Sequence, residues 1–390
     1  MKVKVLAASI AMSIALSGCG GSDDSGSSNN SNGGVATEYK LNGYTEKGPY
    51  QPASVVTIQE LDQNLQQTGI SYTTQTYDYF GEYDVSANLG SSLVEMFIDG
   101  YFFNEVTNAV DEEKLIMSAY VDLSLGSNVN LSITTALIKD LVKKLYDEGK
   151  TFEQANIEAT QALLDLYGYG EYDAADFYQV TLHDGGDESA ILLAISALTI
   201  KLAEDDWDTT LTQKIHEISK LLANPTEAEY TTLEAEILEK NGEISHVDSV
   251  MTQYFEANGK EFNIPPFLFF IRDENGDFVD RSKPIFLSGG IGIATSQPSE
   301  PTYYEHDTKI EAYDEQGREL TYQVVQQPTS FGEVELIQSN GEWYAHFEGT
   351  LIPSDQNIEN CFTIDTVQPE PSSNQYRQCY MYHPQPSSNR

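Results

Sequence analysis

The chain has 390 residues, of which 61 are acidic and 21 are basic, so its formal net charge is −40 at pH 7. A surface this negative repels nucleic acid and anionic lipid headgroups, which makes both poor partners. The acidity suits a salty medium, where ions screen the self-repulsion, and divalent cations held near the surface are the alternative explanation. The length allows two or three domains.

The first residues have the pattern of an export signal. Lys2 and Lys4 precede an apolar run over residues 5–16, which is shorter than the roughly 20 residues needed to span a bilayer. The run ends in Leu16-Ser17-Gly18-Cys19, which resembles the lipobox of bacterial lipoproteins. The resemblance implies cleavage before Cys19 and attachment of lipid, palmitate included, to that cysteine, so that the chain contacts a membrane through its anchor. An ordinary signal peptide (residues 1–18) with a chance cysteine is the alternative.

Residues 19–37 are polar and rich in glycine and serine, which predicts a flexible tether. The residue after the cysteine is Gly20, not the Asp that resembles an inner-membrane retention signal in enteric bacteria. We therefore expect a lipid-anchored protein of the bacterial outer membrane. Whether it faces the periplasm or the cell surface stays open.

Residues 38–125 have the pattern of a small antiparallel β-sandwich, because short strand-like runs alternate with turn residues. The runs are residues 54–58, 70–74, 82–85 and 93–98.

Several motifs in this part and beyond it point to a known family. They are Lys47-Gly48-Pro49-Tyr50, Gly81-Glu82-Tyr83, Gly100-Tyr101-Phe102-Phe103-Asn104-Glu105, Asn128-Val129-Asn130, Ile191-Leu192-Leu193-Ala194-Ile195-Ser196 and Ile264-Pro265-Pro266-Phe267. Together they resemble a family of bacterial surface lipoproteins whose first domain is similar to the carboxypeptidase regulatory-like sandwich, which has an immunoglobulin-like fold. The resemblance covers residues 43–280 and implies a non-catalytic accessory rather than an enzyme.

Residues 126–262 predict an α-helical domain. Ile133, Leu137, Leu141 and Leu145 recur every four residues along one predicted helix. Further helices are expected to begin at Thr151 with Gln154, at Thr226 with Glu229 and at Ser245 with Asp248, which are spaced like capping boxes. Residues 188–203 predict a helix that is apolar on nearly all of its faces, so we expect it at the centre of the helical domain.

Residues 263–390 predict a return to strands. Residues 267–272 and 277–279 are expected to be strands that flank a hairpin-like turn. Residues 310–325 resemble a strand pair of bacterial cadherin-like or immunoglobulin-like repeats, which are spacers and adhesion units. The predicted fold class is thus multidomain α+β, with an N-terminal β-sandwich, a helical middle and a C-terminal β-sandwich.

Asp273, Asn275 and Asp277 occupy positions one, three and five of an acidic loop, the spacing with which carboxylate and amide oxygens bind calcium. The loop departs from the EF-hand pattern because Phe278 stands at position six and Pro284 at position twelve, and Asp280 is a possible late ligand. A plain Asn-Gly hairpin turn is the favoured alternative. No cofactor other than calcium is suggested.

A second acidic turn runs from Asp314 to Arg318, where cadherin-like repeats often share a calcium ion. Arg318 would repel a cation, so we expect no metal there.

Three cysteines are present, and lipidation would use Cys19. The remaining two, Cys361 and Cys379, are expected to form a disulfide in an oxidising compartment. Metal binding by two thiolates without a nearby histidine is the weaker alternative.

Catalytic motifs are scarce, because the six histidines are scattered and neither a zinc helix nor a nucleophile elbow occurs. The 24 tyrosines are dense at Tyr72, Tyr77, Tyr79, Tyr83 and Tyr101. They predict either an aromatic binding face for polysaccharide or protein, or half-buried strand positions, of which the second is favoured.

The sequence therefore predicts an envelope lipoprotein with a binding, adhesion or scaffolding role, whose partners are an envelope protein or polysaccharide. A hydrolase that acts on an envelope or extracellular polysaccharide is the alternative.

Overall fold

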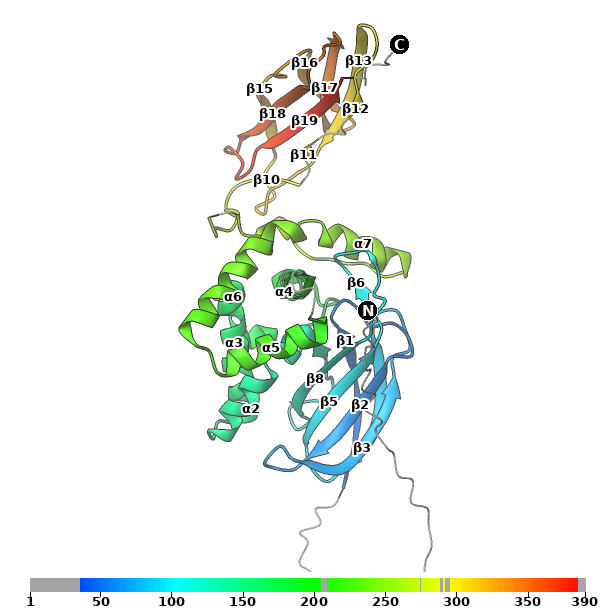
Figure 1. Ribbon diagram of the computed structural model, residues 1–390, viewed down its shortest axis with the longest axis vertical. Coiled ribbons are helices and arrows are strands. Elements are labelled where there is room, and N and C mark those ends of the chain that lie inside the picture. The colour runs from blue at the N-terminus through cyan, green and yellow to red at the C-terminus, as the bar shows by residue number, and fades with distance from the viewer. Residues whose placement is uncertain (1–35, 205–208, 274, 288–289, 292–294, 385–390) are drawn as a thin grey trace, which may run out of the picture. The chain divides into compact units, whose positions relative to one another are not determined.

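The computed structural model describes residues 36–204, 209–273, 275–287, 290–291 and 295–384 (Figure 1). Helices and strands both occur and are largely segregated along the chain, as the α+β prediction required. The predicted signal peptide, Cys19 and nearly all of the tether lie outside the described residues.

The N-terminal strands form two sheets with the orders β4-β1-β9 and β3-β2-β5-β8. Alternation of apolar residues turns Val56, Ile58, Met96 and Ile98 inward, and all four are buried. The strands are β1 (Thr37–Glu46), β2 (Val55–Leu61), β3 (Gln67–Gln75), β4 (Glu82–Leu89), β5 (Leu93–Gly100), β6 (Phe103–Asn104), β7 (Ala109–Val110), β8 (Leu115–Asp122) and β9 (Leu131–Ser132). The four predicted runs fall within β2, β3, β4 and β5, with only Ser54 outside.

The middle of the chain is helical, as predicted. Its helices are α1 (Ile133–Leu137), α2 (Lys139–Asp147), α3 (Phe152–Tyr167), α4 (Gly186–Glu204), α5 (Leu211–Ala223), α6 (Glu227–Lys240) and α7 (Val247–Ala257), with the 3-10 helices η1 (Ala174–Phe177), η2 (Asn241–Ile244) and η3 (Phe267–Phe270). Helix α4 is the apolar helix expected at the centre. It contacts α1, α5, α6 and α7, and Figure 1 shows it end-on among the other helices.

Two of the three predicted helix starts are confirmed. The Thr151 hydroxyl accepts the Gln154 amide at 3.2 Å while the Gln154 side chain accepts the Thr151 amide at 3.2 Å. The Thr226 hydroxyl likewise accepts the Glu229 amide at 3.3 Å. The start at Ser245 is wrong, since η2 leads directly into this residue and holds it in a helical conformation, whereas a capping residue is extended.

One apolar core runs through the N-terminal sheets and the helices, from Leu41 to Ile285. It continues without a break across residue 126, where the sequence predicts a boundary. The sheets and the helices therefore bury their apolar faces against each other.

The C-terminal strands form a second pair of sheets with its own core, which includes Phe286, Phe347 and Phe362. One sheet has the order β13-β17-β16 and the other β11-β19-β18-β15, with β12 also paired to β19. The strands are β10 (Ile285–Phe286), β11 (Gly290–Ile291), β12 (Thr295–Ser296), β13 (Thr302–Ile310), β14 (Ala312–Tyr313), β15 (Thr321–Gln326), β16 (Glu333–Ser339), β17 (Glu342–Leu351), β18 (Ile358–Gln368) and β19 (Tyr376–His383).

Three strand predictions in this part are wrong. Residues 267–270 form η3, and Phe267, Phe269 and Phe270 are all buried, which an alternating strand would not achieve. Among the described residues, 277–279 contribute a single isolated bridge, between Arg272 and Phe278. The expected strand pair over residues 310–325 is also absent, because β14 pairs with β10 and β15 with β18.

Candidate functional site: an uncharged surface and three buried or cross-linked clusters

The predicted calcium loop has the hydrogen bonds of a tight turn. Asp273 Oδ1 accepts the backbone amides of Asn275 at 2.8 Å and Asp277 at 2.9 Å, and its Oδ2 accepts the Asn275 side-chain amide at 3.2 Å. These bonds, led by that from Asp277, lower the pKa of the exposed Asp273. Because amide donors already use both carboxylate oxygens, the geometry fits the hairpin turn better than a calcium site with six to eight oxygen ligands.

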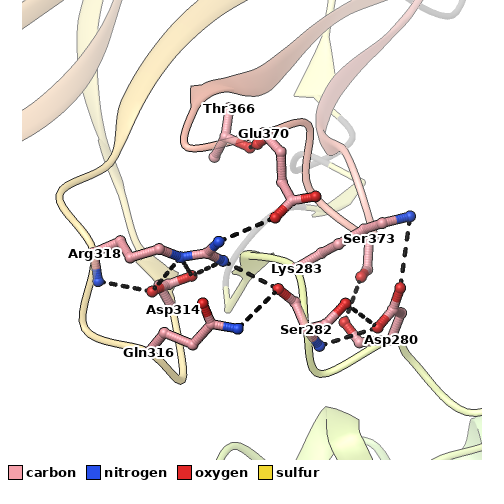
Figure 2. Close-up of polar contacts among 9 residues, drawn as sticks. All are labelled: Asp280, Ser282, Lys283, Asp314, Gln316, Arg318, Thr366, Glu370 and Ser373. Carbon is pink, nitrogen blue, oxygen red and sulfur yellow. Dashed lines mark hydrogen bonds and ion pairs between the residues drawn. The ribbon is translucent and has the colours of Figure 1, made fainter.

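The second acidic turn is neutralised from within the chain (Figure 2). Arg318 donates to Asp314 Oδ1 through Nη2 at 2.6 Å and through Nε at 3.0 Å, and it reaches Glu370 Oε1 at 3.0 Å. The Arg318 contact is the main cause of the lowered pKa of Asp314. The guanidinium thus occupies the position in which a cation would lie.

The structure contains the predicted disulfide between Cys361 and Cys379, with an S–S distance of 2.12 Å. The two cysteines lie opposite each other on β18 and β19 and are buried. Glu359 lies close enough to complete a three-residue metal cluster with them. In the oxidised chain both sulfurs are bonded to each other and neither is a thiolate ligand.

The N-terminal tyrosines divide into two groups. Tyr83 is fully buried and Tyr72 is half-buried, as the strand interpretation requires. Tyr77, Tyr79 and Tyr101 are instead 55%, 52% and 45% exposed. Three large aromatic side chains are therefore left in contact with solvent.

The loop around Gln51 connects the backbones of two of these exposed tyrosines, Tyr79 and Tyr101. The Gln51 amide donates to the Tyr101 carbonyl at 2.8 Å, and its side chain donates to the Tyr254 hydroxyl at 3.0 Å. The Tyr254 hydroxyl in turn donates to the Tyr79 carbonyl at 2.7 Å. Residues far apart in sequence are in this way gathered at one end of the N-terminal sheets.

This aromatic cluster adjoins a stretch without charge. No acidic or basic residue occurs between Asp62 and Asp78, although 21% of the chain is charged. Strand β3 lies in the middle of this stretch and is mostly exposed. We call β3 together with Tyr77, Tyr79 and Tyr101 the uncharged surface, because these residues carry no charge themselves. Charges adjoin it at Asp78, between two of the tyrosines, and at Lys114, which lies 5.8 Å from the centre of the Tyr101 ring. The absence of charged residues from this stretch is visible in the sequence, but only the fold shows that β3 lies at the edge of a sheet.

A buried ion pair joins three of the motifs that carry the family resemblance. Lys47 Nζ lies 3.0 Å from Glu105 Oε1, and both side chains are completely inaccessible to solvent. The Ser196 hydroxyl on α4 donates to Glu105 Oε1 at 2.6 Å and also contacts the Lys47 carbonyl at 3.1 Å. Burial lowers the pKa of Lys47. The contact connects the N-terminal sheets to the central helix.

A second buried pair consists of Glu46 and His183. Glu46 Oε2 accepts the Leu182 amide at 3.0 Å, whereas Oε1 lies 3.7 Å from His183 Nε2. Neither of these two facing atoms has another partner among the described residues. Burial raises the pKa of Glu46 to about 8 and lowers that of His183 to about 4. Both groups are thus neutral near pH 7, which suits a protonated acid that faces an imidazole.

Carboxylates also line one open cavity of about 350 Å³. They are Asp111, Glu113 and Glu204, and Asn104 and Lys114 lie beside them. The Asn104 side chain donates to Asp111 at 3.0 Å.

No protein-family model, curated protein or solved structure matches the chain significantly. Among the helices in the described part of the chain, none has the length and apolar character needed to cross a membrane.

Proposed function

We propose that the chain is a bacterial envelope lipoprotein, held to the outer membrane by lipid on Cys19, with a non-catalytic binding, adhesion or scaffolding role. The observation that carries this proposal is the run from Leu16 to Cys19 after a short apolar segment. The polar tether that follows leaves the folded part free to meet a partner.

The uncharged surface supports the binding role. Tyrosine supplies a large amphipathic contact area at a modest entropic cost, and it is common at the centres of protein interfaces. On a chain of net charge −40, three exposed tyrosines beside an uncharged strand are the part of the N-terminal sheets best suited to contact a partner.

We further propose that the two pairs of sheets are the predicted β-sandwiches of residues 38–125 and 263–390, separated by the helical residues 126–262. The contact of Lys47, Glu105 and Ser196 supports the family resemblance, since three separate motifs supply its members.

Metabolic labelling with an alkyne analogue of palmitate tests the anchor in a bacterium that produces the full chain. Wild type should incorporate label and fractionate with outer membranes, and Cys19→Ala should accumulate as an unlabelled precursor. The Cys361→Ala/Cys379→Ala variant is the matched control, because it loses two cysteines but should keep the label. Equal labelling of Cys19→Ala would refute the lipoprotein proposal.

The alternative, a polysaccharide hydrolase, is favoured by the cavity of Asp111, Glu113 and Glu204, because glycosidases use paired carboxylates. Release of reducing ends from envelope polysaccharide measures this activity. The binding proposal expects none from wild type. Activity that disappears in Glu113→Gln would replace the binding role with the hydrolase.

A further inference from the structure

Strand β3 is an edge strand that lacks the usual protection. It is the outermost strand in the order β3-β2-β5-β8 (Figure 1). Natural edge strands are commonly blocked by charged side chains, by proline or by a covering segment, because their unpaired backbone groups can otherwise pair with another chain. Over nine residues, β3 has neither a charged residue nor a proline. Its three threonines, Ile70 and Tyr72 have high β propensity, which suits pairing.

The hydrogen-bond pattern shows which residues of β3 face the open side. The Thr76 amide donates to the Ser54 carbonyl at 3.0 Å, and the Thr76 carbonyl accepts the Ala53 amide at 2.8 Å, so Thr76 is directed toward β2. Backbone groups alternate in direction along an antiparallel strand. Thr74 and Tyr72 therefore also pair with β2, opposite Val56 and Ile58.

Ser71, Thr73 and Gln75 have the opposite parity. Their amides and carbonyls point away from β2, and all three residues are exposed. Three residues thus present both a donor and an acceptor at the free edge.

The neighbouring edges of the same two sheets are closed by side chains. On β4, the Asp84 carbonyl accepts the Thr74 hydroxyl at 2.9 Å, and the Asn88 carbonyl accepts the Tyr72 hydroxyl at 3.1 Å. On β8, the Ile116 amide donates to the Thr212 hydroxyl of α5 at 3.3 Å. Strand β3 borders β4 through these two side chains. Its edge nevertheless differs from the other two, because the exposed residues Ser71, Thr73 and Gln75 have no hydrogen bond from the described part of the chain to their outward backbone groups.

The charges around β3 restrict the kind of partner. Asp62 precedes the strand, and the exposed Asp84 lies beside it on β4. Asp78 follows the strand but is already paired with Lys260 at 3.7 Å, so Asp62 and Asp84 supply the acidic flanks. A second copy of this chain would bring a net charge of −40 against the same carboxylates. A segment with basic residues at its ends would instead match an uncharged strand with acidic flanks.

We propose that β3 docks an extended segment of another polypeptide, which adds as a fifth strand to β3-β2-β5-β8. Its pairing residues are uncharged and its flanks are basic. The backbone groups of Ser71, Thr73 and Gln75 provide the pairing, and the acidic flanks select the partner. This inference deepens the proposed binding role by naming the class of partner, and it does not depend on the lipid anchor.

The test uses the full mature chain and a synthetic peptide in which threonine alternates with valine and tyrosine between two pairs of lysines. Backbone amide exchange is measured by NMR with and without this peptide. The amides of Ser71, Thr73 and Gln75 should slow at least tenfold, whereas those of Tyr72 and Thr74 should change little because β2 already protects them.

Thr73→Pro removes one free-edge amide and leaves the ladder with β2 intact. It should weaken peptide binding at least tenfold, while Thr73→Ala, which keeps the amide, should bind within twofold of wild type. Thermal melting confirms that each variant folds. A peptide methylated on its backbone nitrogens, and one with glutamate in place of lysine, should both lose affinity.

Three results would overturn the proposal. One is no change in amide exchange at millimolar peptide. Another is equal binding of the methylated peptide, which would indicate electrostatic attraction alone. The third is a concentration-dependent dimer of wild type that Thr73→Pro abolishes, which would assign the edge to a second copy. Palmitate labelling is unaffected by all three, so failure here is distinguishable from failure of the lipoprotein proposal.

Discussion

The Glu46 and His183 side chains show how burial can set protonation without an ion pair. Glu46 is 1% exposed, and its free Oε1 faces the imidazole nitrogen 3.7 Å away. Tyr44, Phe80 and Phe255 surround the His183 ring. In such an apolar setting a charge on either group is costly, so the neutral forms are favoured.

We predict that Glu46 makes the chain less stable as pH rises above neutrality. Burial raises its pKa from 4.5 to about 8, so its contribution is complete below pH 4.5 and is lost as pH rises through 8. The lowered pKa of His183 destabilises the folded chain as pH falls, and this effect sets in only below about pH 6.5. Between pH 6.5 and 8 the free energy of unfolding of wild type should therefore fall by at least about 1 kcal/mol.

Urea unfolding at several pH values measures this effect. The Glu46→Gln variant cannot ionise and should show a level free energy of unfolding over that range. Glu112→Gln changes an exposed glutamate and should follow wild type. A Glu46→Gln variant with the same slope as wild type would contradict the assignment.

The Lys47 and Glu105 pair leads to a second prediction at this scale. Lys47→Met should destabilise the chain by about 3–5 kcal/mol, because it leaves the Glu105 carboxylate buried without its partner. The double variant Lys47→Met/Glu105→Leu should recover much of this loss, since it removes both charges. A double variant as unstable as the sum of the two single variants would show that the pair has no coupling.

At the scale of elements, the loop at Asp273 is expected to act as a turn. Calcium and magnesium should raise the melting temperature by similar small amounts, and salt at seawater strength should remove both effects, because a diffuse ion cloud is screened. Asp273→Asn keeps an acceptor for the loop amides and should melt close to wild type, whereas Asp273→Ala should melt lower. A rise specific to calcium that survives salt and disappears in Asp273→Ala would establish the metal site.

Helices and strands were predictable from the sequence where residues close in sequence determine the conformation. The cap at Thr151 and the apolar helix over residues 188–203 depend on neighbours in sequence, and both occur. The strand over residues 267–272 was wrong because a run of phenylalanines is apolar in either conformation, and only the surrounding core selects the 3-10 helix.

The candidate surface shows the same division between local and non-local information. The missing charge between Asp62 and Asp78 is visible in sequence. That β3 is an edge depends on the order of four strands, and the facing of Glu46 and His183 depends on residues 137 positions apart. Neither the edge position of β3 nor the contact of Glu46 with His183 leaves a signal in the neighbouring sequence.

For the whole molecule, the continuous core predicts that the N-terminal sheets do not fold alone. A fragment of residues 36–125 would expose the inner side chains that pack against the helices, together with the Lys47 and Glu105 pair without Ser196. This fragment should give no cooperative melting transition, whereas residues 36–286 should melt in one step. Circular dichroism during heating measures both. A cooperative transition of the short fragment would contradict the prediction.

The parallel pairing of β1 with β9 has a consequence for the order in which the chain matures. Thr45 pairs with Leu131, and the Lys47 carbonyl accepts a hydrogen bond from the Ser196 hydroxyl, 149 residues further along the chain. Closing such long loops is entropically costly and slow. Synthesis and any transport that begins at the N-terminus deliver β1 first, and its antiparallel partner β4 follows within about 50 residues. The pairing of β1 with β9 and the hydrogen bond from Ser196 to the Lys47 carbonyl can form only after β9 and α4 have followed. The first strand to be delivered is thus completed on its β9 side only when much of the helical region has emerged.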